Sequence, residues 1–373
     1  MAGRKRVSAF VLGIMFVAGG IGGLFYNEMR SADRISTLLE AEDSVTAIPP
    51  GTVNPATDGG LVHLIDEPEI TGIAIDPLLA VEAAALRLDR VVEMYQWREE
   101  NQGSGDNKQS TYVRVWSKER IRSETFDDRG GHENPPAPPI ASQSFFPSSV
   151  ELGRYLISAP VLAMIDADIA KTPREPRSIE GIAFSPTGSY LQSGTPAAPA
   201  IGDIRISLLA AQPETVTAMG RNDNGTIGIW RSGNGDELTI LRSGAFSADE
   251  LIDEQYSANS RLTWALRAAL TLSIFVGMMI IIKRIARMVP VIGRLAARLL
   301  KPVAFVLAVA IALVTMAFGW LVFRPVLSLM LLAGAGILVL VLRWMRAKTP
   351  DEDLAHADVP PPPPPPTGAS PAG

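Results

Sequence analysis

Three long apolar stretches near the end of the chain constrain its fold more than any other feature. They cover residues 262–282, 303–323 and 326–342, and the last two contain no charged residue. At a rise of 1.5 Å per residue, the first two are long enough to cross about 30 Å of hydrocarbon, and the third is at the short end of that length. Soluble helices are amphipathic rather than apolar on every side. The pattern therefore predicts a membrane protein.

A fourth uncharged stretch, residues 7–26, lies near the start of the chain and follows Arg4, Lys5 and Arg6. The alternative is a cleaved signal peptide, but the apolar core of such a peptide is usually 7–15 residues long and ends at a small-x-small cleavage site. This stretch is longer and lacks a clean site, which favours a membrane anchor. The helix is expected to continue through residues 34–42 and to end before Pro49 and Pro50, because proline interrupts a helix.

Positive charges predict the orientation of these spans. The segment between the second and third span is basic and contains no acidic residue; its cations are Lys283, Arg284, Arg287, Arg294, Arg298 and Lys301. By the positive-inside rule, residues 1–6, 283–302 and 343–373 are cytoplasmic, and residues 27–261 lie on the opposite side. The fold class predicted is a multi-pass α-helical membrane protein with four spans and a large extracytoplasmic α+β domain that is rich in strands.

The extracytoplasmic domain shows the alternation of half-buried strands. Residues 86–97 and 111–121 both alternate between apolar and polar side chains, which predicts a long antiparallel hairpin. Helices are expected at 147–156 and 160–169, each opening with a proline, and Ser247 with Glu250 forms a capping-box pattern at the start of a helix. Further short strands are expected at 61–65, 70–75, 204–209, 215–219, 226–230 and 237–241.

The basic cytoplasmic segment is predicted to contact lipid. Pro290 fits the first turn of a helix, and Arg294, Arg298 and Lys301 then fall on one side of a short amphipathic helix. Such a helix is expected to lie on anionic headgroups together with Lys283, Arg284 and Arg287, although an ordinary charged loop is the alternative. The tail at 343–373 contains seven consecutive prolines, 360–366, and is expected to be a solvated, disordered spacer.

Two glycines of the first span, Gly19 and Gly23, have the small-xxx-small spacing that lets helices approach closely. This spacing indicates helix packing and self-association. Because glycine is common in spans, the indication is weak on its own.

Composition argues against several classes of chemistry. The net charge of −5 does not suit nucleic acid, and the absence of cysteine excludes disulfides, thiolate catalysis and cysteine-ligated zinc. The three histidines, His63, His132 and His356, are not in metal-ligand spacing, so neither metal nor cofactor is expected. His132-Glu133-Asn134 is a catalytic candidate, but a loop-fixing hydrogen-bond cluster is favoured. Glu93 is interpreted as the solvent-side residue of a strand rather than as an acid or base.

Transport is a second class of function to weigh. Transporters carry ionisable groups inside their spans, and these spans have none at mid-depth. Arg267 is close to the outer end of its span, where its side chain is expected to snorkel to the interface.

Several unusual strings occur in a fixed order, and together they resemble the LUMA family, which comprises transmembrane protein 43 and its bacterial relatives. The resemblance covers nearly the whole chain except the proline tail, and residues 93–97 are its most specific part. The strings are GLVHL at 60–64, RVVEMYQW at 90–97, GHENP at 131–135, GDIRIS at 202–207, GAFSADE at 244–250, LRAA at 266–269 and GWLVFRP at 319–325.

The resemblance implies a four-span protein with a large luminal or periplasmic domain. Animal members are in the endoplasmic reticulum and inner nuclear membrane, where they self-associate and act as a scaffold for emerin and lamins. The cysteine-free, Ala- and Pro-rich composition suggests a bacterial member, so the bacterial inner membrane is expected, with the endoplasmic reticulum or inner nuclear membrane as the alternative. The function expected is a non-enzymatic scaffold that forms a homo-oligomer with unknown membrane-protein partners. A transporter or channel accessory subunit, or a membrane-anchored hydrolase, is the alternative.

Overall fold

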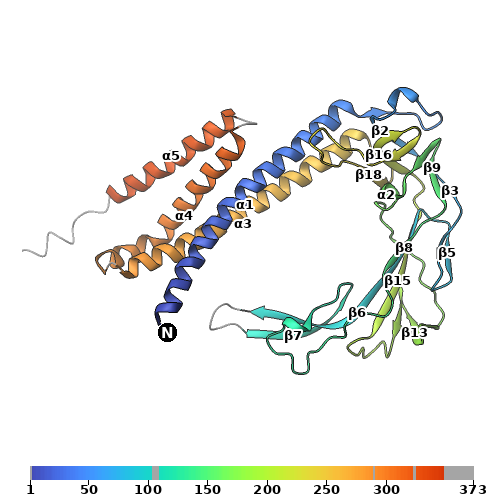
Figure 1. Ribbon diagram of the computed structural model, residues 1–373, viewed down its shortest axis with the longest axis horizontal. Coiled ribbons are helices and arrows are strands. Elements are labelled where there is room, and N and C mark those ends of the chain that lie inside the picture. The colour runs from blue at the N-terminus through green and yellow to red at the C-terminus, as the bar shows by residue number, and fades with distance from the viewer. Residues whose placement is uncertain (1, 103–108, 289, 322–324, 348–373) are drawn as a thin grey trace, which may run out of the picture. The chain divides into compact units, whose positions relative to one another are not determined.

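The computed structural model describes residues 2–102, 109–288, 290–321 and 325–347 (Figure 1). Side chains are described within these ranges except at 2–9, 286–300, 342 and 344–347. The chain divides into two compact units, one formed by residues 1–35 and 257–373 and the other by residues 36–256. The first unit is helical and the second is rich in strands.

The helical unit draws on four helices: α1 (Ala2–Ser44), α3 (Ala248–Met288), α4 (Pro290–Trp320) and α5 (Pro325–Ala347). Among the described residues, three apolar helical segments are long enough to cross a membrane by length and composition, and they are Phe10–Ser44, Ala248–Ile285 and Lys301–Trp320. The apolar part of α5, Pro325–Val341, is shorter. The prediction of a membrane protein with a β-rich domain is therefore confirmed, and α1 continues past the first span as expected.

The helix predicted to begin at Pro290 does begin there, but it is not a separate short element. The α4 backbone is helical from Pro290 to Trp320 with Pro302 inside it, so the expectation of a loop at 283–302 with its own short helix was wrong. Apolar helices tolerate proline where neighbouring groups satisfy the freed backbone. In this segment Lys283 and Lys301 are exposed and Arg284 is half-buried.

The headgroup contact of this segment stays a prediction. The side chains of Arg287, Arg294 and Arg298 lie outside the described residues, as do Arg324 and the tail from residue 348 onward, which includes the proline run. Residues 343–347 belong to α5.

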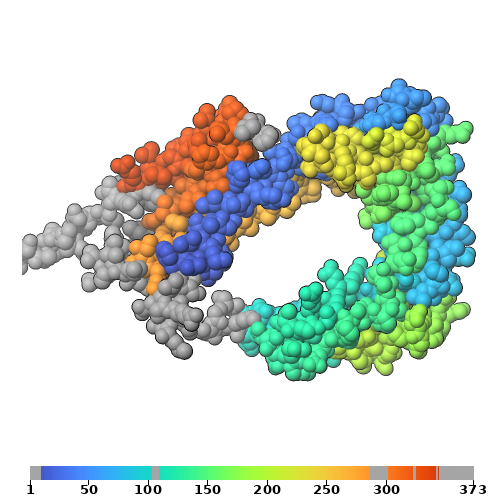
Figure 2. Space-filling view, in the orientation of Figure 1, coloured from blue at the N-terminus to red at the C-terminus, as the bar shows by residue number. Residues whose placement is uncertain are grey.

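The helices of this unit share a small core. Leu24 of α1, Ile274 of α3, and Ala308 and Ala312 of α4 are buried together. The red helix α5 lies beside the orange helix α4 (Figure 2). Because most of the buried residues of α4 are alanines, its backbone can come close to its neighbours, and close van der Waals contacts between small side chains form the interface.

Glycines bring α1 and α3 into backbone contact. A Cβ built on Gly277 would lie 2.7 Å from the Gly13 carbonyl oxygen, and one on Gly20 would lie 2.5 Å from Cγ1 of Ile274. Gly23, one of the two glycines singled out from the sequence, lies against Leu270 in the same way. A Cβ on Gly19, the other one, would have no described atom within 4 Å. The α1–α3 contact thus uses Gly23 but not Gly19.

In its described residues, the strand-rich unit contains two larger sheets (Figure 1). In order, the first sheet is β1 (Thr46–Ala47), β2 (Leu61–Asp66), β16 (Val216–Asp223), β17 (Thr226–Gly228), β10 (Tyr155–Ile157), β9 (Ser149–Leu152) and β3 (Pro68–Thr71), with β18 (Ile240–Ser243) paired to β16. The second is β12 (Arg177–Ile179), β13 (Ile182–Thr187), β14 (Tyr190–Ser193), β15 (Ile204–Ala211), β6 (Arg87–Gln102) and β7 (Gln109–Ser117). In the second sheet β11 (Ile169–Ala170) pairs with β15, and β8 (Gln143–Phe145) pairs with β6.

The unit also contains smaller elements. They are the β4–β5 hairpin (Ala74–Asp76 and Val81–Ala83), the short helix α2 (Ala159–Leu162) and two single turns of 3₁₀ helix, η1 (Pro55–Thr57) and η3 (Ser123–Thr125). Each sheet has its own core. Val62, Leu152 and Tyr155 are buried on the first, and Val92 and Phe184 on the second.

The long hairpin predicted from alternation is confirmed and is longer than expected. From Arg87 to Trp97 every second residue of β6 is buried, because the pleat sends alternate side chains to opposite faces. Strand β7 pairs with β6 in the register Met94 to Ser117. The capping box is also confirmed, since Ser247 and Glu250 hydrogen-bond each other's backbone N–H at the start of α3.

Two helix predictions were wrong. Residues 147–156 form strands β9 and β10, because Gly153 takes a φ of 59° and reverses the chain there. Val150 and Leu152 then point into the core of the first sheet. At 160–169 only the four-residue α2 is α-helical, and β11 begins at Ile169. A proline in a first turn permits a helix but does not require one.

Candidate functional site

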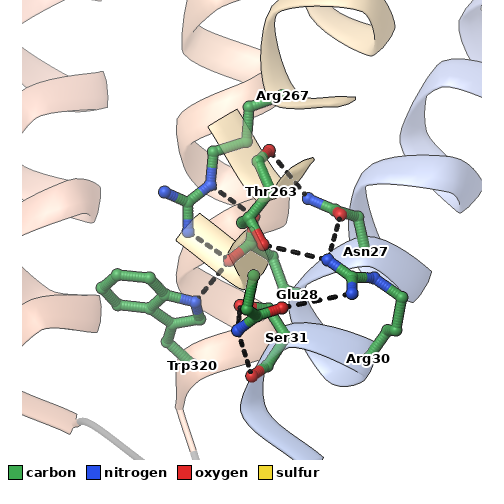
Figure 3. Close-up of polar contacts among 8 residues, drawn as sticks. Asn27, Glu28, Arg30, Ser31, Thr263, Arg267 and Trp320 are labelled. Carbon is green, nitrogen blue, oxygen red and sulfur yellow. Dashed lines mark hydrogen bonds and ion pairs between the residues drawn. The ribbon is translucent and has the colours of Figure 1, made fainter. Parts of the chain in front are cut away.

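Polar side chains from three helices meet in the helical unit (Figure 3). Positions 27–31 of α1, positions 259–267 of α3 and the last residue of α4 contribute to this polar cluster. Its members are Asn27, Glu28, Arg30, Ser31, Asn259, Thr263, Arg267 and Trp320.

Glu28 lies at the centre of the polar cluster and its side chain is fully buried, with 0% exposed. Arg267 donates from Nε to Glu28 Oε1 at 2.8 Å and from Nη2 to Oε2 at 2.6 Å. Trp320 donates from its indole Nε1 to the same Oε2 at 2.5 Å. The carboxylate therefore accepts three hydrogen bonds, two of them as a bidentate charge-assisted pair, which is the strong geometry for an arginine and a carboxylate.

Local packing holds this geometry in place. The Arg267 guanidinium lies 4.7 Å from the Trp264 ring centroid and 5.3 Å from that of Trp320, within the range of cation–π attraction. A Cβ on Gly319 would lie 2.8 Å from the Glu28 Cβ. Glycine at 319 thus allows α4 to approach close enough for the neighbouring indole to reach the carboxylate.

The remaining members bind α1 to α3 through hydrogen bonds whose acceptors are neutral oxygens. Asn27 Nδ2 donates to the Thr263 carbonyl oxygen at 3.3 Å. Arg30 donates to Asn259 Oδ1 at 3.1 Å and to Thr263 Oγ1 at 3.0 Å, and Asn259 Nδ2 donates to the Ser31 carbonyl oxygen at 3.3 Å. Buried polar groups are costly without partners, so these bonds fix the register of the two helices.

The polar cluster is suited to a structural role, which is to hold helices together. A buried carboxylate with three donors has little free acceptor capacity, and its charge is neutralised by Arg267. Removing either partner would leave the other charge buried and uncompensated. The arrangement suits holding three helices in one register.

The sequence indicated Arg267 but not its partner Glu28. Arg267 was expected to snorkel to the interface, which stays a prediction; in the structure its side chain is 11% exposed and pairs with Glu28. A signal was present. Consecutive spans run in opposite directions, so the end of the first span and the start of the second lie at the same depth, which brings an acid at 28 level with a base at 267.

A second set of side chains gathers on the outer face of the second sheet. Tyr95 and Trp97 of β6 lie directly opposite Trp116 and Arg114 of β7, so all four share one face. Arg205 of β15 joins them, 4.9 Å from the Trp116 ring centroid. We call these five residues the β6 face.

Glu93 lies on this same side of β6, as predicted, while Met94 and Gln96 are buried on the opposite side. The Glu93 carboxylate is not surrounded by water alone, because Arg205 Nε donates to its Oε2 at 2.7 Å. The buried Gln96 binds the segment after β7, since its side-chain amide accepts from the Ile121 N–H at 2.8 Å and donates to the Glu119 carbonyl oxygen at 2.9 Å.

The candidate motif at 132–134 splits into separate roles. Asn134 Oδ1 accepts from the Trp97 N–H at 2.7 Å, and its Nδ2 donates to the carbonyl oxygens of Trp97 and Ile121 at 2.9 and 3.1 Å. The interpretation as a loop-fixing cluster is therefore confirmed for Asn134. His132 instead stacks on Tyr112, with ring centroids 3.9 Å apart, and Glu133 is exposed.

Two further titratable side chains of the strand-rich unit, Tyr112 and His63, also have hydrogen-bond partners. The Tyr112 hydroxyl donates to Glu99 Oε1 at 3.1 Å, and burial raises the pKa of this tyrosine. His63 is buried on β2 with Nε2 2.8 Å from the Phe246 carbonyl oxygen, and His356 lies outside the described residues. In the part of the chain that the structure describes, no three His, Cys, Asp or Glu side chains gather as metal ligands would.

Comparison with known proteins gives a consistent result. Residues 94–325 match the family model described as "Transmembrane protein 43". The human protein of that name is 30% identical over 348 residues, covering 86% of each chain, and the mouse protein is 30% identical over 326 residues, covering 81% of each. The Drosophila melanogaster homologue is 28% identical over 343 residues, covering 86% of this chain and 90% of its own. No solved structure matches.

The matched residues include the β6 face and the α3 and α4 members of the polar cluster, whereas the α1 members of that cluster, at positions 27–31, precede the match. The chain belongs to the transmembrane protein 43 family.

Proposed function

We propose that the chain is a non-enzymatic integral membrane scaffold that organises assemblies of membrane proteins. Its helices anchor it in the bilayer, and residues 27–261 form an interaction domain outside the cytoplasm. The observation that carries this proposal is the β6 face, where three aromatic and two arginine side chains lie together on one side of a sheet.

The composition of the β6 face is that of a protein-binding surface. Trp, Tyr and Arg are the residues enriched at the energetic centres of protein interfaces. The opposite side of β6 is filled by the core, with Val92 and Met94 nearly inaccessible, so the strand is held rigid from behind. Arg114 is exposed and the aromatic side chains are half-buried. A partner binding here would gain apolar contact at a small cost in side-chain entropy.

The non-enzymatic part of the proposal rests on how the catalytic candidates are used. Glu93 pairs with Arg205, and the amide of Asn134 is committed to three backbone bonds. Both residues therefore have structural roles that account for their positions.

An anchoring role for the helices is favoured over transport by the polar cluster. A transporter needs an ionisable group that can exchange partners during its cycle. Glu28 is instead fully buried and bonded to Arg267 and Trp320 on two other helices.

The proposed topology has four spans, at residues 7–26, 262–282, 303–323 and 326–342, with both termini in the cytoplasm. The basic residues between 283 and 301 would contact anionic headgroups. The membrane proposed is the bacterial inner membrane, supported by the absence of cysteine; the endoplasmic reticulum or inner nuclear membrane is the alternative.

Self-association is proposed through α1. A Cβ on Gly19 would meet no described atom within 4 Å, so this face of α1 is uncovered. Met15 and Tyr26 on the same face are among the most exposed apolar side chains of the helix. The spacing of these positions puts them on one side of α1.

Site-specific photo-cross-linking in native membranes tests the scaffold. A benzoylphenylalanine replacing Arg114 is expected to yield discrete cross-linked species with protein partners. The matched control replaces Lys118, which is exposed just beyond the end of β7. Adducts from position 114 and not from 118 support the proposal. No adducts at 114, or the same adducts from both positions, contradict it.

A further inference from the structure

A groove runs between α3 and α4 in the helical unit, and neither the anchor nor the scaffold role uses it. It encloses about 430 Å³, a volume in the range of small-molecule sites. Its walls are almost entirely apolar, with Leu272 of α3 and Phe305 of α4 59% and 58% exposed. Phe275 meets Phe305 edge to face, with ring centroids 6.1 Å apart.

One end of the groove is polar because Arg267 lines it. The Nε and Nη2 nitrogens of Arg267 donate to Glu28, and Nη1 has no hydrogen-bond acceptor among the described residues. Figure 3 shows Nη1 pointing away from the carboxylate. The cation–π contacts with Trp264 and Trp320 hold the guanidinium in this orientation. A fixed N–H donor therefore faces an otherwise apolar groove.

The local charge favours an anion at this end. Glu28 and Arg267 cancel, while the described acceptors of Arg30 are the neutral oxygens of Asn259, Thr263 and Asn27. The polar cluster thus carries one net positive charge. A guanidinium N–H is well suited to a phosphate oxygen.

Trp264 indicates the depth of this end in the bilayer. Its side chain is 64% exposed and lines the groove beside Arg267. Tryptophan concentrates at the headgroup level of membranes, with its apolar ring toward the chains. The polar end therefore lies at the height of lipid phosphates, and the apolar part extends toward the acyl chains.

We propose that the groove between α3 and α4 is a specific site for one phospholipid of the bilayer. A phosphate oxygen accepts from Arg267 Nη1, and one acyl chain lies along Leu272, Phe275 and Phe305.

Native mass spectrometry of the full-length chain in detergent tests the site, with phosphatidylglycerol and diacylglycerol of identical chains as probes. The unmodified protein is expected to retain one phosphatidylglycerol at least tenfold more tightly than diacylglycerol. Equal retention of the two probes would show that the phosphate is not recognised, and the proposal would fall.

A matched pair of variants locates the lipid. Ala268 lines the groove next to Arg267, so Ala268→Trp is expected to fill it and to weaken phosphatidylglycerol retention about tenfold. Ala265→Trp makes the same change at an exposed position outside the lining and is expected to leave retention unchanged. Equal retention by both variants would mean that the lipid is only part of the general annulus. If Ala268→Trp does not fold, the comparison of the two probes on the unmodified protein still decides the question.

Discussion

At the scale of single residues, the polar cluster depends on Glu28. A fully buried carboxylate is unfavourable by itself, and Arg267 and Trp320 make it favourable by supplying charge and donors in a fixed geometry. Breaking a buried pair costs more than replacing it, because the remaining charge has no partner. The two kinds of substitution should therefore have different effects.

Glu28→Gln is expected to lower the free energy of unfolding by about 3–5 kcal/mol, since it leaves Arg267 without its counter-charge. The double change Glu28→Met with Arg267→Met is expected to recover much of that loss, because no buried charge remains. Thermal unfolding in detergent, followed by circular dichroism, measures both. A single variant as stable as the parent, or a double variant less stable than the single, would show that the pair does not hold the helices together.

The glycines of α1 and α3 provide a second test at this scale. Gly277→Ala is expected to destabilise the helical unit by about 1–3 kcal/mol, because its Cβ would overlap the Gly13 carbonyl oxygen. Gly19→Ala is the control, since its Cβ would meet no described atom and alanine is the better helix former by up to about 1 kcal/mol. Stability in detergent should fall for the first variant and stay or rise for the second. The reverse order would place Gly19 at the intramolecular contact.

At the scale of elements, the start of α3 is set by its capping box. The Ser247 N–H and hydroxyl donate to Glu250 Oε2 at 2.8 and 3.0 Å, and the Glu250 N–H reaches the Ser247 Oγ at 3.2 Å. Backbone and side-chain hydrogen bonds from Ser247 lower the pKa of Glu250. Folding therefore favours the ionised form of this carboxyl group.

The lowered pKa gives a pH dependence of known sign. The stabilisation is present above the unfolded pKa of glutamate, about 4.3, and is lost as the pH falls through the lower folded value. Glu250→Gln should therefore melt below the parent at pH 7, and the two melting temperatures should converge as the pH falls below the lowered folded pKa of Glu250. Asp249→Asn, in the same turn but without a described bond to Ser247, should not show this convergence. A gap for Glu250→Gln that is constant with pH would contradict the assignment.

The elements that could be predicted from sequence are those whose signal is local. The apolar spans, the β6–β7 hairpin and the cap at Ser247 follow from length, alternation and a four-residue motif. Strands β12, β13 and β14 were not expected, because each is short and is held by pairing with its neighbours. A helix was expected where strands β9 and β10 lie, because Pro147 fits a helix's first turn. The positive φ of Gly153, which reverses the chain, decided the structure instead.

The candidate sites were harder to predict, because they join residues that are distant in sequence. Glu28 and Arg267 are 239 residues apart, and Arg205 reaches Glu93 across two paired strands 112 positions apart. Alternation put Glu93 on the correct side of β6, but the identity of its partner depends on strand order and register. Such pairings arise from tertiary contacts that no local pattern encodes.

At the scale of the whole molecule, both proposed roles depend on the membrane topology of the chain. The scaffold proposal requires the β6 face outside the cytoplasm, and the phospholipid proposal requires Glu28, Arg267 and Trp320 at one membrane depth. Both requirements are met by four spans with cytoplasmic termini, because consecutive spans then run in opposite directions. In the proposed topology, the even number of spans would bring residues 27–261 to one side and both ends of the chain to the other.

Reporter fusions at residues 110, 290, 324 and 360 measure this topology most directly. The four fusions are expected to read outside, inside, outside and inside in that order. A cytoplasmic reading at residue 110 would contradict the proposed topology, since the β6 face would then lie on the same side as the basic segment at 283–302.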